Sequence, residues 1–463
     1  MTAAGAIDLS RYAGCRCGVM GLGRSGLAAA AALAEAGAQV TAWDDGADAR
    51  ARAARPGVTV APLLDQDLAG YRMIVWSPGI PHLHPRPHPV AEAARAAGCP
   101  LVCDIALLAE AAGATPLVGI TGTNGKSTTT ALIGHLLTTA GVPTAVGGNI
   151  GQAALSLPRL PAEGVYVLEL SSYQLELIGE ARFRVGVLLN ITPDHLDRHG
   201  GMDGYVDAKR NLFRRMGAGD VAVVCIDDPN TRAIAEKLAG SGRHVVRVGI
   251  GDASECVFHV DAEGFLHDRL DDAPSAPLDL KRATGLPGRH NWQNAVAAYA
   301  AARMLRLAPD AIAAGLLSFP GLAHRLQAVG EVDGVRFIND SKATNADAAA
   351  RALACFEHIH WIAGGVPKAG GIESLRGLFG RIDHAYLIGQ AADEFARTIG
   401  DALPVTMSGT LDRAVADAFA EARRHRADRP VVLLSPACAS FDQFTDFEAR
   451  GAAFATAVRE LQP

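Results

Sequence analysis

The chain has 463 residues, of which 49% are apolar and 20% are charged, and its formal net charge is −6. That length suits about three domains of roughly 150 residues, and the composition is that of a globular protein with large buried cores. The negative balance argues against nonspecific nucleic-acid binding. Because the sequence shows neither a signal-peptide pattern nor an apolar run of about 18 residues, we expect a soluble cytoplasmic protein with no nucleic-acid or membrane partner.

Short apolar runs alternate with alanine-rich helical stretches along the whole chain, which predicts α/β units and parallel sheets. The pattern falls into three blocks, residues 1–104, 105–320 and 321–463. The third block has four apolar runs of its own, "GVRFI", "HIHWIAGG", "HAYLIG" and "PVVLLS". The eight cysteines form no C-x-x-C pair and lie mostly in or beside apolar runs, as reduced buried thiols do.

The first block begins with a nucleotide-binding pattern. Gly21, Gly23 and Gly26 give G-x-G-x-x-G directly after the apolar run "CRCGVM". Asp44 ends the next run, "QVTAW", where an acid that binds ribose is expected. Taken alone, the pattern points to an NAD enzyme, or simply to close packing of a strand and a helix. It predicts a nucleotide-like ligand whose kind this block does not decide.

The third run of this block, "RMIVWSPGI", ends in another tight turn, at residues 77–79. The stretch that follows, "IPHLHPRPHP" at residues 80–89, contains three histidines, which could suggest a metal site. Because prolines dominate the spacing, a solvated loop is the favoured interpretation.

The second block opens with a phosphate-loop pattern whose glycines are shifted. "VGITGTNGKSTTTALIGHLL", residues 118–137, has no glycine at position 120, where G-x-x-x-x-G-K-[ST] requires one. The working parts are nevertheless present, because N–H groups of the loop can face a phosphate at a helix N-terminus. A lysine can reach the terminal phosphates and a hydroxyl can bind Mg²⁺. The predicted phosphate-binding residues are Gly122, Thr123, Asn124, Gly125, Lys126, Ser127 and Thr128.

Two later runs end in polar residues. "GVYVLELSSYQLE" carries Glu169 near its strand end, where a carboxylate can hold Mg²⁺ directly or through water. "VGVLLNITPDHLDRHG" ends in a polar cluster with His195, which lies where ligands bind in a doubly wound sheet. This histidine could be a metal ligand or a substrate contact. Lys209, in "YVDAKRNLF", is by default a solvated helix lysine.

Together these stretches resemble the Mur ligases. "GITGTNGKST", "GGNIG", "ELSSYQLE", "NITPDHLDRH", "GRHNWQN", "HR", "INDSKATN" and "SPACASFDQF" occur in this order in that family. The resemblance covers essentially the whole chain, including "GLGRSG", and two of the stretches, "ELSSYQLE" and "SPACASFDQF", are most similar to the member that adds D-glutamate. It implies a Rossmann-like domain for the UDP-substrate (1–104), a central P-loop ATPase-like domain with a parallel sheet (105–320) and a Rossmann-like domain for the amino acid (321–463).

The resemblance also implies an activity, ATP-dependent amide ligation in peptidoglycan precursor synthesis by a monomer. The carboxylate of UDP-N-acetylmuramoyl-L-alanine would attack the γ-phosphate of ATP, and D-glutamate would capture the acyl phosphate. Two anions must then approach each other, so positive charge is required. By the family pattern, Lys126 and two Mg²⁺ ions supply it. Ser127 and Glu169 would hold one ion, and His195 and Lys209, carbamylated by CO₂, the other.

Further contacts follow from the same resemblance. The ATP site would include Asn291, Asn294, Arg325, Asp340 and Lys342, although a structural salt bridge between the last two is the alternative. The UDP-substrate would contact Arg24, Ser25, Asp44, Ser77, Pro78, Gly79, Asn149, Ser171, Gln174 and His195. D-Glutamate would contact Thr344, Lys368, Ser440, Phe441 and Phe447. A basic residue with hydroxyl donors suits a dicarboxylate.

Other functions stay open at this point. A sibling ligase that adds L-alanine shares the three-domain plan, as does folylpolyglutamate synthetase, although the latter lacks the "GLGRSG" domain. The choice between D- and L-glutamate depends on pocket shape. A nicotinamide-dependent dehydrogenase would explain only the first block. A non-catalytic nucleotide sensor would not need metal ligands that combine a carboxylate with a histidine.

Overall fold

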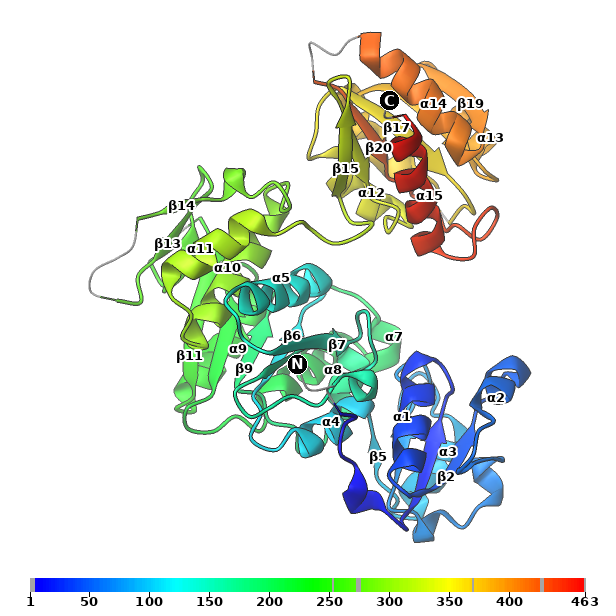
Figure 1. Ribbon diagram of the computed structural model, residues 1–463, viewed down its shortest axis with the longest axis vertical. Helices are drawn as coiled ribbons and strands as arrows, with labels where there is room; N and C mark the ends of the chain where they lie inside the picture. The colour runs from blue at the N-terminus through cyan, green and yellow to red at the C-terminus, as the bar shows by residue number, and fades with distance from the viewer. Residues whose placement is uncertain (1–4, 252–253, 272–275, 369, 425–428, 462–463) are drawn as a thin grey trace. The chain divides into compact units, whose positions relative to one another are not determined.

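The computed structural model describes residues 5–251, 254–271, 276–368, 370–424 and 429–461. Its strands form three sheets, and the chain divides into two compact units (Figure 1). The first unit comprises Met1–Leu280 and Trp292–Leu316, and the second comprises Lys281–Asn291 and Leu317–Pro463. The predicted α/β class with parallel sheets is confirmed.

The first sheet has the strand order β3-β2-β1-β4-β5, and all of its strands are parallel. Its strands are β1 (Arg16–Met20), β2 (Gln39–Trp43), β3 (Val58–Val60), β4 (Met73–Trp76) and β5 (Leu101–Val102), and its helices are α1 (Arg24–Glu35), α2 (Ala47–Ala53), α3 (Pro89–Ala96) and α4 (Asp104–Ala112). Since β1 and β4 are neighbours, the turns that follow them meet. A Cβ atom on Gly21 would lie 2.4 Å from Cβ of Ser77.

The second sheet, also in the first unit, has the order β14-β13-β12-β11-β10-β9-β6-β8-β7. Its strands are β6 (Leu117–Thr121), β7 (Thr144–Gly148), β8 (Val165–Glu169), β9 (Val185–Leu188), β10 (Val221–Cys225), β11 (His244–Ile250), β12 (Phe258–Val260), β13 (Phe265–Asp268) and β14 (Leu278–Asp279). The strands from β7 to β12 pair in parallel, and β13 and β14 extend the sheet in antiparallel fashion. β6, β8 and β9 are buried along their whole length, as strands covered on both faces are.

The helices of this region are α5 (Lys126–Thr139), α6 (Ser172–Glu176), α7 (Leu196–His199), α8 (Met202–Arg210), α9 (Pro229–Gly240), α10 (His290–Met304) and α11 (Pro309–Ser318). α5 follows β6 directly and packs against β6, β7 and β8 (Figure 1). The sheet therefore presents the loops after β8, β6 and β9, three adjacent parallel strands, at one edge.

The third sheet, in the second unit, has the order β15-β16-β20-β17-β18-β19. Its strands are β15 (Gln327–Val332), β16 (Val335–Asn339), β17 (Ile359–Gly364), β18 (Ile382–Ile388), β19 (Val405–Gly409) and β20 (Val431–Leu434), and its helices are α12 (Ala346–Leu353), α13 (Ala392–Ile399), α14 (Leu411–Ala422) and α15 (Phe447–Glu460). Only β15 runs antiparallel to its neighbour. Separate apolar clusters, one with α12 and α13 and one with α14 and α15, cover this sheet.

All eight cysteines are free thiols, and six of them are buried, as the sequence predicts. Across the described residues, no helix combines the length and the apolar character needed to cross a membrane.

Candidate active site

The glycine-rich loop lies between β6 and α5. Gly125 precedes the first residue of α5 and has a left-handed φ of 84°. A Cβ atom there would lie 2.2 Å from Oδ1 of Asn294, so both backbone conformation and space require glycine. The loop after β9 braces the turn, since the N–H groups of Thr123 and Asn124 donate to the backbone and side-chain oxygens of Asn190, each at 2.8 Å.

Two lysines converge on this loop. Nζ of Lys126 donates to the carbonyl oxygens of Gly122 and Thr123, at 2.9 and 2.8 Å. Nζ of Lys209, from α8, donates to the same Gly122 oxygen at 2.8 Å. The loop thus gathers two amines at the place where the sequence predicts a polyphosphate.

Lys209 is not the solvated helix lysine that its spacing suggests. Lys209 is only 1% exposed, and its Nζ lies 4.5 Å from the ring centroid of Tyr205. Burial lowers the pKa of Lys209 well below its ordinary value, and the positive charge of Lys126 lowers it further. A lowered pKa makes the neutral, nucleophilic form of the amine easier to reach than in a solvated lysine.

Glu169, at the end of β8, offers an oxygen for a cation. The residue is 3% exposed, and its Oε1 accepts a hydrogen bond from Nδ2 of Asn149 at 2.8 Å. Its other oxygen, Oε2, is buried and has no hydrogen-bond partner among the described residues. An unsatisfied buried carboxylate oxygen is costly by itself and is the type of ligand that Mg²⁺ prefers. The donor chemistry here therefore fits a magnesium ion.

His195 lies in the loop after β9 and caps α7. Its φ of 52° is left-handed, which is unusual outside glycine. The side chain is half exposed, with Nε2 3.5 Å from Oδ2 of Asp194 and the ring 5.2 Å from that of Tyr173. The described residues contain no group of three or more His, Cys, Asp or Glu side chains that could hold a metal. Only two of the four predicted metal ligands, Glu169 and His195, are of these types.

Sequence reasoning missed a buried network beside Ser171. Nδ1 of His199 lies 2.7 Å from Oε1 of Glu176, and its Nε2 lies 2.9 Å from Oγ of Ser172. Nε2 of His82 reaches the other oxygen of Glu176 at 3.3 Å. The available signal was the spacing of Ser172 and Glu176, four residues apart and hence on one helix face. His82 is 9% exposed, so the proline-rich stretch is not wholly the solvated loop that was predicted.

Ser171 and Gln174 form a capping box at the start of α6. Oε1 of Gln174 accepts from the N–H and the hydroxyl of Ser171, both at 3.1 Å, and its Nε2 donates to Oδ1 of Asp104 at 3.3 Å. Asp104 is buried, and desolvation raises the pKa of its carboxyl group. The predicted substrate contacts Ser171 and Gln174 are thus fixed by each other and by a residue that the sequence did not single out.

In the first sheet, the predicted uridine contacts gather around the two tight turns. Oδ2 of Asp44 accepts from the N–H of Leu22 at 2.7 Å, so this carboxylate folds back onto the glycine-rich turn. Arg24 and Ser25 are the first two residues of α1. The carbonyl oxygens of Pro78 and Gly79, next to Ser77, accept hydrogen bonds from Arg198 at 3.4 and 3.1 Å.

In the second unit, Asp340 follows β16 and is buried. Its Oδ2 accepts from Oγ of Ser435 at 2.8 Å and its Oδ1 from the N–H of Leu326 at 3.2 Å. Desolvation raises the pKa of Asp340 to about 7. Nζ of Lys342 lies 3.8 Å from the ring centroid of Phe447.

The other predicted residues of the second unit lie in its loops, except Asn291, which lies in the first turn of α10. Ser440 is buried, whereas Phe441 is 73% exposed. Lys368 and Arg325 are exposed, and Thr344 is half-buried. Asn291 donates to the carbonyl of Pro287 at 2.7 Å. Asn294, in the first unit, accepts from the hydroxyl of Thr129 at 3.3 Å.

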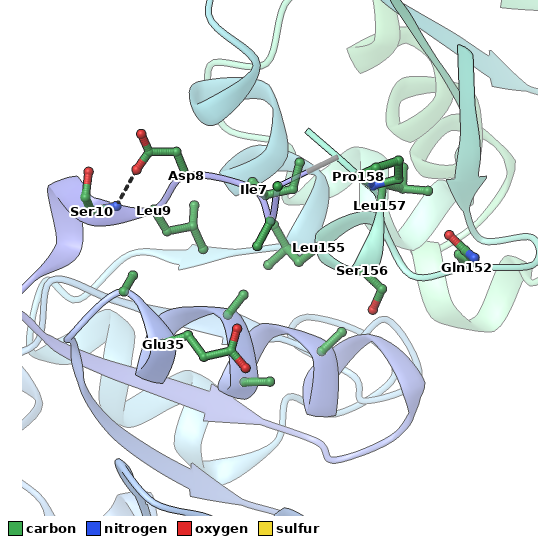
Figure 2. A pocket seen from close by; sticks show the side chains of 16 residues that line it. Ile7, Asp8, Leu9, Ser10, Glu35, Gln152, Leu155, Ser156, Leu157 and Pro158 are labelled. Carbon is green, nitrogen blue, oxygen red and sulfur yellow. Dashed lines mark hydrogen bonds between the residues drawn. The ribbon is translucent and has the colours of Figure 1, made fainter. Parts of the chain in front are cut away.

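A cavity of about 740 Å³ in the first unit contains none of the predicted site residues. Figure 2 shows that α1 contributes Glu35 to its wall, facing Leu155 and Ser156 from the other side. Its lining is mainly alanine and other apolar side chains, with Asp8 hydrogen-bonded to the N–H of Ser10 at 3.0 Å. Its described lining residues include no lysine, arginine or histidine that could meet an anionic ligand, so we assign no function to this cavity.

Comparison with known proteins agrees with this geometry. Residues 120–302 match the family described as "Mur ligase middle domain", and residues 324–438 match "Mur ligase, glutamate ligase domain". A protein of Paramagnetospirillum magneticum named UDP-N-acetylmuramoylalanine--D-glutamate ligase is 54% identical over 439 residues, covering 94% of both chains. The chain belongs to the Mur ligase family. A Caulobacter protein of the same name is 48% identical, covering 98% of both chains.

Solved Mur ligases share the fold. The chain resembles UDP-N-acetylmuramate-alanine ligase from Thermotoga maritima with a TM-score of 0.59 at 16% identity, covering 96% of this chain and 99% of the other. It resembles MurF from Acinetobacter baumannii with a TM-score of 0.57 at 23% identity, covering 76% and 79% of the two chains. At these identities the likeness supports the Mur ligase architecture alone.

Proposed function

We propose that the protein is an ATP-dependent ligase that joins D-glutamate to UDP-N-acetylmuramoyl-L-alanine, with release of ADP and phosphate, in peptidoglycan precursor synthesis. The observation that carries the proposal is the sheet edge formed by β8, β6 and β9. There a phosphate-type loop, a buried carboxylate oxygen with no hydrogen-bond partner in the described part of the chain and a buried lysine come together. The names of relatives about half identical over nearly the whole chain supply the substrates.

The proposed reaction has two steps. An oxygen of the muramoyl-alanine carboxylate attacks the γ-phosphorus of ATP, and ADP leaves. The amine of D-glutamate then attacks the resulting acyl carbon, the phosphate departs, and the nitrogen loses a proton to solvent. Each approach is opposed by like charge, so the site must supply positive charge in fixed positions. Lys126, already within 3 Å of its own loop carbonyls, is placed to turn toward a polyphosphate.

The residues present fit magnesium, which would neutralise phosphate charge when bound. Glu169 and Ser127 are the proposed ligands of one ion, and His195 and Lys209 those of a second. Lys209 would act after carbamylation, because CO₂ adds to a neutral amine and the product is an anionic oxygen ligand. The burial and the neighbouring positive charge of Lys209 support this role. Thr123, Asn124, Gly125 and Thr128 are proposed to surround the phosphates.

The remaining predicted contacts, including the uridine site around Asp44 and the glutamate site around Lys368, are part of this proposal. So are the three domain ranges, action in the cytoplasm and a monomeric state. A nicotinamide-dependent dehydrogenase would leave the amines and the carboxylate around the phosphate loop without purpose, so we favour the ligase.

The test is release of phosphate from ATP by the purified protein with Mg²⁺. We expect release only when UDP-N-acetylmuramoyl-L-alanine and D-glutamate are both present, with one amide formed for each phosphate. Replacing D-glutamate by L-glutamate or L-alanine tests the amino acid. Equal release with either substrate alone, or a preference for another amino acid, would contradict the proposal.

A further inference from the structure

Arg450, on α15, is a buried cation that the proposed reaction does not use. The residue is 1% exposed, and its Nε donates to Oγ of Ser341 at 2.9 Å. Nη2 donates to the carbonyl oxygens of Ser341, at 2.9 Å, and Cys438, at 3.1 Å. All these acceptors are neutral, and no carboxylate among the described residues forms a salt bridge with Arg450.

The third nitrogen of the guanidinium group, Nη1, stands apart from the other two. Nη1 is buried and makes no hydrogen bond within the described residues. A Cβ atom on Gly365 would lie 3.2 Å from Nη1, so this nitrogen lies close to the backbone of Gly365. Burial lowers the pKa of Arg450 to about 10, which still leaves the group charged at neutral pH.

Fold stability does not explain such a group. Moving a charge out of water costs several kcal/mol, and an apolar residue of similar volume often gives a fold that is equally or more stable. A buried cation with neutral acceptors and an unused donor is therefore better explained by what surrounds it.

Its surroundings are three loops that carry the predicted amino-acid contacts. Ser341 belongs to the loop with Thr344, Cys438 to the loop with Ser440, and Gly365 to the loop with Lys368. The last two loops are also joined directly, because the backbones of Val366 and Ala439 exchange hydrogen bonds of 2.9 and 3.2 Å. The N-terminal turn of α15 adds a further tie, from the Ser341 hydroxyl to the carbonyl oxygen of Phe447, at 2.9 Å.

We propose that Arg450 is a positioning residue for the acidic amino-acid substrate. Its fork fixes two of the loops relative to each other. Its charge forms no salt bridge among the described residues and adds to that of Lys368 to favour a dicarboxylate. Asp442 is an acid whose charge acts on Arg450 through space without pairing with it. The inference rests on the proposed function, which supplies glutamate as the substrate. It adds a residue that touches none of the reacting atoms.

The experiment compares Arg450→Met and Arg450→Lys with Arg459→Met, an exposed arginine on the same helix whose side chain bonds only to its own helix. KM is measured for each of the three substrates, with kcat, in the full-length protein. We expect Arg450→Met to raise KM for D-glutamate at least about tenfold, because the loops that carry the glutamate contacts lose both the fork and the charge. KM for UDP-N-acetylmuramoyl-L-alanine should change less than about threefold, because all of its predicted contacts lie in the first unit. KM for ATP should rise less than KM for D-glutamate; some increase is expected, because Ser341 stands between the predicted ATP contacts Asp340 and Lys342.

Arg450→Lys keeps the charge and loses the fork, so its KM for D-glutamate should fall between those of the wild type and Arg450→Met. Arg459→Met should match the wild type. A glutamate KM within twofold of wild type in both Arg450 variants would overturn the inference. So would equal increases in KM for all three substrates, which is the result of a merely structural role. If Arg450→Met does not fold, Arg450→Lys decides by the same criteria. A wild-type protein that does not ligate D-glutamate would reject the proposed function itself.

Discussion

Asp340 is predicted to make the protein less stable than it would be with a neutral side chain. Its carboxyl group is buried with two neutral donors, the Ser435 hydroxyl and the Leu326 N–H. Desolvation raises its pKa from an ordinary value of 3.8 to about 7, while Arg325 opposes the shift. Asp340→Asn removes the ionisable group and keeps the shape, and the Ser435 hydroxyl can reverse to accept from the new amide.

The size and sign of the effect follow from the pKa. Between pH 3.8 and about 7 the unfolded chain has lost this proton and the folded protein has not, so stability falls as pH rises through this window and is level above it. At about 1.4 kcal/mol per pKa unit, the penalty is roughly 1.5 kcal/mol at pH 5 and roughly 4 kcal/mol at pH 8.5. Because the second unit is of single-domain size, Asp340→Asn should raise the Tm of its unfolding transition by about 10 °C at pH 8.5 and by about 4 °C at pH 5.

Thermal unfolding followed by circular dichroism at both pH values measures this directly, with Asp401→Asn, an exposed residue, as the matched control. The variant should also lose ligase activity, since a costly buried acid is explained by its predicted role toward the nucleotide. A gain of the same size at both pH values, or a loss of stability at pH 8.5, would refute the reasoning about desolvation.

Three further predictions concern the first unit. Lys126→Ala should lower kcat by orders of magnitude with little change in Tm, because its ammonium group bonds to the carbonyl oxygens of the phosphate loop and not to the core; wild-type turnover would exclude it from the reaction. Lys209→Ala should be inactive and partly rescued by short-chain carboxylates in a steady-state assay, and full activity without them would remove the carbamate. His259, buried with its pKa lowered to about 4 mainly by desolvation, should cost stability as pH falls from about 6.5 to 4. His259→Phe should flatten the pH dependence of Tm in that window, and an unchanged slope would contradict this.

The sequence predicted the parts of the fold that repeat a simple pattern. The run "PVVLLS" became β20, which is buried throughout, because buried parallel strands need continuous apolar residues. "QVTAW" became β2, in which buried residues alternate with more exposed ones. β19, "VTMSG", was missed because it is an edge strand with one exposed apolar side chain, Met407, and no such run. The antiparallel strands β13 and β14 were missed for a related reason, since each is short and partly polar.

For the candidate site, the sequence predicted which loops carry the functional residues better than it predicted how deeply those residues are buried. Strand ends and glycines placed the phosphate loop and Glu169 at one sheet edge. The burial of Lys209 and Arg450 could not be predicted in the same way. Both lie on helices, and the spacing of apolar residues along these helices does not indicate that a charged side chain faces the interior. The spacing of Ser172 and Glu176 indicated that they share a helix face, but not that His199 of α7 pairs with Glu176, because that pairing depends on how two helices pack.

The central claim is that the muramoyl-alanine carboxylate is activated as an acyl phosphate at the loop of residues 122–128. The most direct measurement uses UDP-N-acetylmuramoyl-L-alanine with ¹⁸O in that carboxyl group and follows the label by mass spectrometry of the released phosphate. The account predicts one ¹⁸O atom in each phosphate formed. Phosphate that carries no label, with amide product formed at the normal rate, would contradict it.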